Sequence, residues 1–327
     1  MNTPIIDFVR GYAEKSTLRL HMPGHKGCGA LGCELHDITE INGADSLYEA
    51  GGIIAESERN ASELFGCDTF YSTEGSSLCI RAMMYLVTLY AREQGRKPYI
   101  LVGRNAHKTF LSAAALLDFE VGWLYPSEND TYLACSIAPE TLEKSIFSAP
   151  EKPVAVYITS PDYLGNLADV KALSKVCHKY GVLLLVDNAH GAYLKFLPQS
   201  LHPIDLGADM CCDSAHKTLP CVTGGAYLHI TRNAPKVFLE RAKDALAMFG
   251  STSPSYLILQ SLDAVNKYIE SGYREALASF IAKIDECRTA LKGLGYTLLG
   301  NEPLKLSVNT AEYGYDGREF AEILRER

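Results

Sequence analysis

The stretch Val182-Leu-Leu-Leu-Val186-Asp187-Asn188-Ala189-His190-Gly191 is a short apolar run that ends in a carboxylate. A run of aliphatic residues without polar alternation is typical of a strand buried on both faces of a parallel sheet. The preceding segment, Val170–Tyr180, has the apolar spacing of a helix, and Gly181 follows it as a helix-ending glycine. Ligands of open α/β sheets bind beside the carboxyl ends of the strands, so we expect Asp187 to face a binding site.

Further apolar runs of this kind occur at Tyr99–Val102, Val154–Thr159 and Ala226–Ile230. The segment Ser77–Ala91, which precedes the first of them, shows helical spacing of its apolar residues. This alternation of strands and helices predicts an α/β fold in which helices cover both faces of a mostly parallel sheet.

The sequence divides into three expected parts. Residues 1–50 form an N-terminal segment, residues 51–265 form a large domain, and residues 266–327 contain a connecting helix and the start of a small α+β domain. The mostly helical pattern from Ser255 to about Leu291 supports the connecting helix. A strand at Leu304–Asn309 and a helix at Gly317–Arg327 follow, and we expect the small domain to be incomplete in this chain.

The composition argues against several classes of protein. The 327 residues are 47% hydrophobic and 21% charged, which is typical of a globular α/β chain. The formal net charge of −8 argues against a nucleic-acid partner, because neutralising phosphates requires a basic surface. The sequence has neither a signal-peptide pattern nor a run of about 18 apolar residues, so we expect no membrane partner and a cytoplasmic location.

The cysteines do not indicate a disulfide framework or a metal site. All 10 are expected to be reduced thiols. Cys211 and Cys212 are adjacent, and Cys28 and Cys33 have no CxxC spacing or histidine cluster beside them. Zinc ligands occur at characteristic short spacings, so the sequence predicts no metal site.

A lysine follows another apolar stretch, Met210–Cys212, in the segment Asp213-Ser214-Ala215-His216-Lys217-Thr218. A lysine that forms a Schiff base must lose its proton at the working pH, and a partly desolvated pocket favours the neutral amine. Lys217 is therefore the candidate Schiff-base lysine, with Asp187 as a carboxylate that would keep a cofactor's pyridine nitrogen protonated. The alternatives are a solvated loop lysine and an aspartate that caps a turn.

Two further segments carry candidate ligands. Ser72-Thr-Glu-Gly75-Ser76-Ser77 opens a helix, where free N–H groups and hydroxyls bind a phosphate, although Ser and Thr also occur there as ordinary N-caps. Gly103-Arg104-Asn105-Ala106-His107-Lys108-Thr109 places His107 after a strand, where its ring could stack on an aromatic cofactor or be structural.

Together these segments resemble the motif set of the Orn/Lys/Arg decarboxylase family, which has fold type I of the pyridoxal phosphate enzymes. The resemblance extends over essentially the whole chain. Its motifs are His21-Met-Pro23-Gly24-His25-Lys-Gly27, Thr39-Glu40-Ile-Asn-Gly43-Ala-Asp45-Ser-Leu47, Arg104-Asn-Ala-His107-Lys, Val186-Asp187-Asn-Ala-His190-Gly-Ala, Ser214-Ala-His216-Lys217-Thr218 and Ser251-Thr-Ser-Pro254-Ser-Tyr256.

The resemblance implies a role for each matching residue. Lys217 would bind pyridoxal 5′-phosphate covalently, Asp187 would face its pyridine nitrogen, His107 would stack on its ring, and His190 would lie near the ring hydroxyl or the substrate carboxylate. The residues implied around the phosphate are Gly75, Ser76, Ser77, Ser214 and His216.

The resemblance also implies an assembly. The Ser251–Tyr256 loop, with Ser253 as a cofactor contact, would reach the site of a second copy across a twofold axis of a homodimer or larger homo-oligomer. Glu74 stands where the family usually has a small polar residue or Asn, and we expect its carboxylate to point away from the phosphate.

The implied reaction is decarboxylation of arginine, lysine or ornithine to the amine and carbon dioxide, as in polyamine biosynthesis. Another fold type I reaction, such as transamination or carbon–sulfur cleavage, would use the same lysine and aspartate. A catalytically impaired homologue that still binds the cofactor is also compatible with the motifs. The sequence does not identify which basic amino acid is the substrate.

Overall fold

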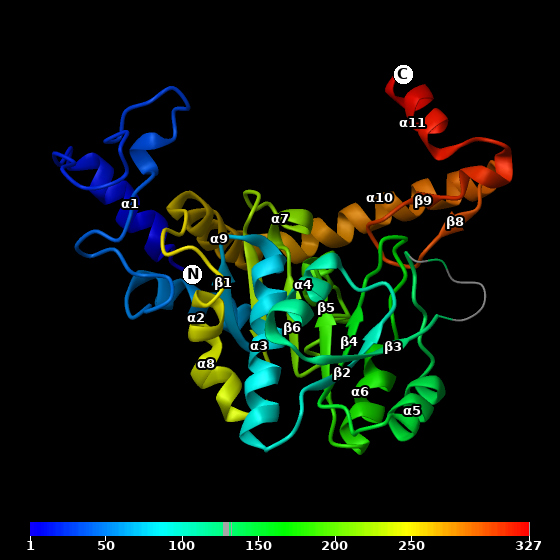
Figure 1. Cartoon of the computed structure of the whole chain (residues 1–327). Helices are drawn as coiled ribbons and strands as arrows, with labels where there is room; N and C mark the ends of the chain where they lie inside the picture. Colours follow the sequence, from blue (N-terminus) through cyan, green and yellow to red (C-terminus); the bar gives the residue numbers. More distant parts are fainter. Residues whose placement is uncertain (127–130, 132, 327) are drawn as a thin grey trace.

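The computed structural model describes residues 1–126, 131 and 133–326 (Figure 1). Within them a seven-stranded sheet has the order β1-β7-β6-β5-β4-β2-β3. Strand β7 runs antiparallel to β1 and β6, and the other neighbouring pairs are parallel, so the predicted mostly parallel sheet is confirmed. The strands are β1 (Asp68–Ser72), β2 (Tyr99–Gly103), β3 (Glu120–Leu124), β4 (Ala155–Thr159), β5 (Leu183–Asp187), β6 (Met210–Asp213) and β7 (Ala226–Ile230).

Helices cover both faces of this sheet, as predicted (Figure 1). One face packs against α3 (Gly75–Glu93), α4 (Lys108–Leu117) and α8 (Lys236–Ala247). The opposite face packs against α5 (Pro139–Ser148) and α6 (Val170–Lys179) beside β2, β4 and β5. Beside β1 and β7 it packs against α1 (Pro4–Glu14), α2 (Ile53–Phe65) and α9 (Tyr256–Tyr268).

Strand β6 shows how the two faces are separated. Met210 and Cys212 belong to the core under α3 and α8, whereas Cys211 belongs to the core under α5 and α6. Successive side chains of a strand point to opposite faces, so Asp213 lies on the same face as Cys211. All four side chains are fully buried, which explains why this segment reads as an apolar run.

All five apolar stretches named from the sequence lie in strands, but β1 and β3 were not predicted. Both lie at the edges of the sheet and pair on one side. Edge strands tolerate polar residues, and these two begin with Asp68-Thr69 and with the exposed Glu120. The apolar-run signal is therefore strongest for the central strands.

The predicted helical connection is interrupted. A π-helical turn, Ile269–Tyr273, separates α9 from α10 (Arg274–Gly293), and Gly272 within it has φ +115°. The proposed domain boundary at residue 266 falls inside α9, while the backbone break lies at Gly272. The division into domains remains a proposal.

The predicted strand at Leu304–Asn309 is shorter in the structure. Only β9 (Ser307–Val308) is a strand, and it pairs with β8 (Leu298–Leu299). The predicted last helix is α11 (Gly317–Arg325), and residue 327 lies outside the described residues. The short helical elements are η1 (Glu34–His36), η2 (Ala192–Phe196), α7 (Ala215–Thr218) and η4 (Thr310–Tyr313). None of the helices in the described residues has the length and hydropathy needed to cross a bilayer.

Candidate active site

A cavity of about 350 Å³ lies where the parallel strands end. Residues that follow β1, β2, β4, β5 and β6 line it, because the carboxyl ends of parallel strands share one edge of the sheet. The cavity brings together all the candidate site residues except Ser253, namely Gly75, Ser76, Ser77, His107, Asp187, His190, Ser214, His216 and Lys217.

Hydroxyl groups gather at the N-terminus of α3. Ser214 Oγ donates a hydrogen bond to Ser76 Oγ at 2.9 Å, which joins the end of β6 to the first turn of α3. Thr109 Oγ1 donates to Ser77 Oγ at 3.2 Å. The first N–H groups of a helix have no acceptor within it, and the macrodipole favours an anion there. This end of the cavity therefore suits a phosphate.

Gly75 contributes shape to this end of the cavity. Its N–H is already used, since it donates to the Gly224 carbonyl at 2.7 Å. Its φ of +71° is a conformation that residues with a side chain rarely adopt. A side chain here would also point toward His216, whose Cε1 would lie 3.8 Å from a Cβ atom.

Asp187 is a buried carboxylate on the cavity wall, 3% exposed. Tyr157 donates its hydroxyl to Oδ2 at 3.2 Å, and the Ala189 N–H donates to Oδ1 at 3.2 Å. Burial raises the pKa of Asp187, although the Ala189 N–H and the charges of His107 and Lys217 oppose the shift. A cation beside this carboxylate would stabilise its ionised form.

His107 is the N-cap of α4, and its ring is held in one tautomer. Its Nδ1 accepts the Thr109 N–H at 3.3 Å, so the proton of the neutral ring is on Nε2. Burial lowers the pKa of His107, so the neutral imidazole is favoured near pH 7. A neutral ring lining the cavity can stack on an aromatic ligand.

Lys217 and His190 meet at the mouth of the cavity. Lys217 Nζ lies 3.2 Å from His190 Nε2, and the His190 ring also makes an edge contact with Tyr163. Lys217 is among the exposed residues, and it also lines the cavity, so the partial desolvation of its amine stays a prediction. The lysine lies on the short helix α7, which follows β6 directly.

Glu74 lines the cavity, and its side chain also binds the loop that carries Ser253. Glu74 Oε1 accepts the Ser251 N–H at 2.6 Å, so its carboxylate binds the start of the Ser251–Tyr256 loop. Ser253 is exposed and does not line the cavity of its own chain. Its role at a second copy's site stays a prediction.

The sequence did not identify several residues of the wall. The additional lining residues are Thr159, Pro161, Tyr163, Thr223 and Gly224. Tyr157 does not line the cavity but donates a hydrogen bond to Asp187. Thr159 and Asp187 are register partners at the ends of β4 and β5, so the rule that drew attention to Asp187 also applies to Thr159. Thr159 Oγ1 is buried and has no hydrogen-bond partner among the described residues.

These donors and charges fit pyridoxal 5′-phosphate. The hydroxyls and helix terminus at Ser76 suit its phosphate, and the buried Asp187 carboxylate suits a protonated pyridine nitrogen. Lys217 supplies an amine at the rim, and the unpartnered Thr159 hydroxyl can take up a ligand hydrogen bond.

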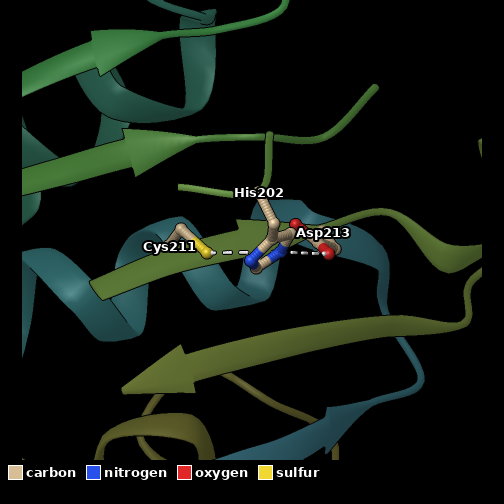
Figure 2. Close-up of side chains that lie close together, drawn as sticks. All are labelled: His202, Cys211 and Asp213. Carbon is tan, nitrogen blue, oxygen red and sulfur yellow. Dashed lines mark hydrogen bonds and ion pairs between the residues drawn. The ribbon is translucent and has the colours of Figure 1, made fainter. Parts of the chain in front are cut away.

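A buried polar cluster lies directly behind the lysine segment. Figure 2 shows His202, Cys211 and Asp213, whose ligand-type atoms all lie within 4.8 Å of one another. Sequence spacing predicted no metal site, but the fold brings these three separated residues together. Burial raises the pKa of the Cys211 thiol well above its usual value.

Hydrogen bonds account for this cluster. Asp213 Oδ2 pairs with His202 Nε2 at 3.0 Å and with His229 Nε2 at 3.2 Å, and Oδ1 accepts from Asn188 Nδ2 at 2.7 Å. The bond to Asn188 joins the segment that follows β5 to the end of β6. The cluster therefore fixes the spacing between the backbone segments that carry Asp187 and Lys217.

The sequence is similar to known proteins over nearly its whole length. Residues 3–298 match the family described as Orn/Lys/Arg decarboxylase, major domain. An arginine decarboxylase of Halalkalibacterium halodurans is 31% identical, over 99% of this chain and 69% of the relative. The uncharacterized protein YaaO of Bacillus subtilis is 29% identical, over 99% of this chain and 70% of the relative.

Solved structures share the fold. Lysine decarboxylase A from Pseudomonas aeruginosa superposes with a TM-score of 0.75 at 22% identity, over 89% of this chain and 43% of that one. A cysteine desulfurase from Thermococcus onnurineus superposes with a TM-score of 0.64 at 17% identity, over 100% of this chain and 80% of that one. The fold is that of the fold type I pyridoxal phosphate enzymes, and this chain spans less than half of the lysine decarboxylase structure.

Proposed function

This chain belongs to the Orn/Lys/Arg decarboxylase family, and we propose that it binds pyridoxal 5′-phosphate and removes carbon dioxide from a basic amino acid. One observation carries the proposal. A lysine, a buried carboxylate and a hydroxyl-rich helix N-terminus surround a single cavity at the carboxyl edge of the sheet.

Each of these groups has a part in the proposed reaction. When bound, pyridoxal phosphate supplies an electron sink for the bond that releases carbon dioxide. Asp187 would hold a proton on the pyridine nitrogen. Burial disfavours its ionised form, and a neighbouring cation would stabilise that form. Ser76, Ser77, Ser214 and His216 would hold the phosphate. The His216 Nδ1–H donates to the Gly225 carbonyl at 3.0 Å, which fixes the orientation of that ring.

His107 and Lys217 would hold the cofactor's ring in one orientation. The neutral His107 ring would cover one face of the cofactor, with its orientation set by the Thr109 N–H. Lys217 would hold the cofactor covalently and exchange with the amine of the substrate. His190 would accept a hydrogen bond near the reacting groups, since burial and Lys217 keep its ring neutral.

The names of the relatives support a basic amino acid as the substrate. Arginine and lysine are the amino acids in the names of the decarboxylases reported above. A cytoplasmic homodimer that acts in polyamine biosynthesis, with Ser253 reaching the second copy's cofactor, completes the proposal.

The direct test is product analysis of the chain loaded with the cofactor. Arginine, lysine and ornithine, each labelled at the carboxyl carbon, would be supplied in turn, and labelled carbon dioxide and the matching amine would be measured. We expect stoichiometric release of both from at least one substrate, and none from Lys217→Ala. A keto acid as the main product from these amino acids, or sulfide released when cysteine is supplied instead, would contradict decarboxylation.

A further inference from the structure

The buried cluster behind the lysine segment contains four side chains of the types that bind transition metals. Cys211 and Asp213 lie on β6 and His229 lies on β7, whereas His202 belongs to the loop that precedes β6 (Figure 2). Cys211 and His229 are register partners, and side chains two residues apart on a strand share a face, so Asp213 joins them on one face of the sheet. The fold thus brings ligands from three segments to one point.

The distances between the ligand atoms suit a tetrahedral metal site. His202 Nε2 lies 3.0 Å from Asp213 Oδ2 and 3.9 Å from Cys211 Sγ. His229 Nε2 lies 3.2 Å from the same carboxylate oxygen. Ligand atoms about 2.0 to 2.3 Å from a zinc ion, at the corners of a tetrahedron, are roughly 3.3 to 3.8 Å from one another. Small shifts of these side chains would therefore place them around one ion.

One ring nitrogen of His202 faces two of the other ligands. Nε2 carries either one proton or one lone pair, so it makes one strong hydrogen bond, which the 3.0 Å separation assigns to Asp213. The sulfur of Cys211, 3.9 Å from the same nitrogen, is left with a weak contact. An ion among the three atoms would contact all of them, whereas a proton joins only two.

The charges of the cluster balance those of a divalent cation. Two neutral imidazoles, one carboxylate and one thiolate together carry two negative charges, so a bound Zn²⁺ makes the site neutral. All four side chains are fully buried, and a neutral site avoids the cost of a net charge in the interior. The ion would replace the proton of the Cys211 thiol, which passes to the solvent.

Neighbouring groups already orient two of these ligands. Thr69 Oγ1 lies 2.9 Å from His229 Nδ1, so it can accept that ring's proton and leave Nε2 free to bind an ion. Asp213 Oδ1 accepts from Asn188 Nδ2 at 2.7 Å, while Oδ2 faces the two imidazoles. Outer contacts of this kind fix the orientation of metal ligands.

We propose that the cluster binds a divalent transition-metal ion, with Zn²⁺ as the best fit, through His202, Cys211, Asp213 and His229. Imidazole and thiolate ligands suit zinc, whereas magnesium and calcium take oxygen ligands. The ligands are closed to solvent, which is typical of a structural ion and not of a catalytic one. In the chain without an ion, the hydrogen bonds described above join the same atoms.

The test is the zinc content of the whole chain. The chain would be produced in cells supplied with zinc, because the buried ligands must meet the ion as the chain folds, and purified without a chelator. Elemental mass spectrometry should then find about one zinc ion per chain. Chain produced with Co²⁺ instead should show the absorption of tetrahedral cobalt at wavelengths longer than those of the cofactor.

Cys211→Ala removes the sulfur ligand and little volume, so this variant should still fold. Its zinc content should fall at least about 10-fold, since even the outer partners of metal ligands contribute that much to affinity. Cys177→Ala is the matched control, because it removes a fully buried thiol of α6 that is not part of the cluster. This control should keep the zinc content and the cobalt absorption of the wild type. Circular dichroism of each variant would verify folding.

The outcomes decide the assignment. A wild-type chain without zinc would overturn the site. Zinc retained equally by Cys211→Ala would also overturn it, because the ion would then lie elsewhere in the chain. Zinc present in the wild type and in Cys177→Ala, but lost from a folded Cys211→Ala, would support the site. Neither result depends on whether the chain releases carbon dioxide.

Discussion

Nζ of Lys217 lies 3.2 Å from Nε2 of His190. This contact joins the segment that follows β5 to the segment that follows β6. The lysine amine can donate this hydrogen bond, in which case His190 Nε2 is the acceptor and the ring proton is on Nδ1. Burial first, and the charge of Lys217 second, lower the pKa of His190 to about 4. His190 is therefore neutral over the whole range in which such an enzyme would work.

His190→Asn should change how stability depends on pH. The pKa of His190 is lower in the folded chain than its ordinary value of 6.5, so the unfolded chain takes up the proton first as the pH falls. The wild type thus loses stability between about pH 6.5 and 4. The free energy of unfolding in urea, measured at several pH values, should rise in the variant relative to the wild type as the pH falls below 6.5. A constant difference across this range would contradict the pKa assignment.

Lys217→Ala should abolish covalent attachment of the cofactor. The lysine lines the cavity at its rim, and its amine is the proposed point of attachment. Borohydride reduction of the cofactor-loaded chain, followed by peptide mass spectrometry, should find the cofactor on Lys217 in the wild type and nowhere in the variant. Lys108→Ala, which removes an exposed lysine next to His107, should be labelled as the wild type is. Label on another lysine in the wild type would refute the assignment.

Asp187→Asn should separate stability from activity. The pKa of Asp187 is higher in the folded chain than its ordinary value of 3.8. The folded chain is therefore destabilised as the pH rises from 3.8 through the pKa of the folded state. The cofactor-free variant should melt at the same temperature as the wild type or higher at pH 7, because an amide can still accept from Tyr157 and Ala189. With the cofactor, turnover should fall about a hundredfold or more, since an amide cannot hold the pyridinium proton. Wild-type turnover in this variant would contradict the role of Asp187.

The central strands could be predicted from the sequence, and so could the carboxyl ends of these strands, where the site residues lie. Apolar runs as short as Leu183–Asp187 are read directly because both faces are buried, and the polar residue after such a run faces the ligand edge. The same reasoning could have found Thr159. Edge strands β1 and β3 lack this signal because one side of each is open.

The rest of the site depends on contacts between distant residues. His202, Asp213 and His229 meet only because a loop, β6 and β7 pack together, and no spacing along the chain reports this. The exposure of Lys217 depends on how α7 turns after β6, which local composition does not specify.

Asp213→Asn should destabilise the chain by about 3 kcal/mol, because it leaves two buried imidazoles without their carboxylate. Burial alone would raise the pKa of Asp213, but His202 and His229 hold it well below its usual value. Burial alone would lower the pKa of His229, but Asp213 and Cys67 raise it. Figure 2 shows one of the two imidazoles, His202, against this carboxylate.

The pH dependence of this loss follows from the two shifts. The contribution of Asp213 is present above its unfolded pKa of 3.8, and that of His229 is present below its unfolded pKa of 6.5 and fades as the pH rises through its folded value. The difference in unfolding free energy, measured in urea, should be larger near pH 6 than near pH 9. Asp244→Asn breaks an exposed pair with Arg241 and should cost less than about 0.5 kcal/mol at either pH.

The last prediction concerns a site shared between two copies of the chain. Ser253 is exposed in its own chain, and the loop that carries it is tied to Glu74 beside the α3 terminus. If this loop reaches the second copy's phosphate, Ser253→Glu should weaken cofactor binding by repulsion, although the residue does not line its own cavity. Equilibrium dialysis of the variant would measure the loss.

Mixing the two impaired variants, at a cofactor concentration too low to load Ser253→Glu, tests the sharing directly. Lys217→Ala and Ser253→Glu chains, unfolded together in equal amounts and refolded, should form hybrid dimers in which one site carries both changes and the other carries neither. Since half of the dimers are hybrids, the mixture should recover about one quarter of the wild-type activity. Two unmixed preparations refolded separately provide the baseline. Activity of the mixture that stays at this baseline, or a chain that is monomeric at micromolar concentration with the cofactor bound, would show that each site belongs to one chain alone.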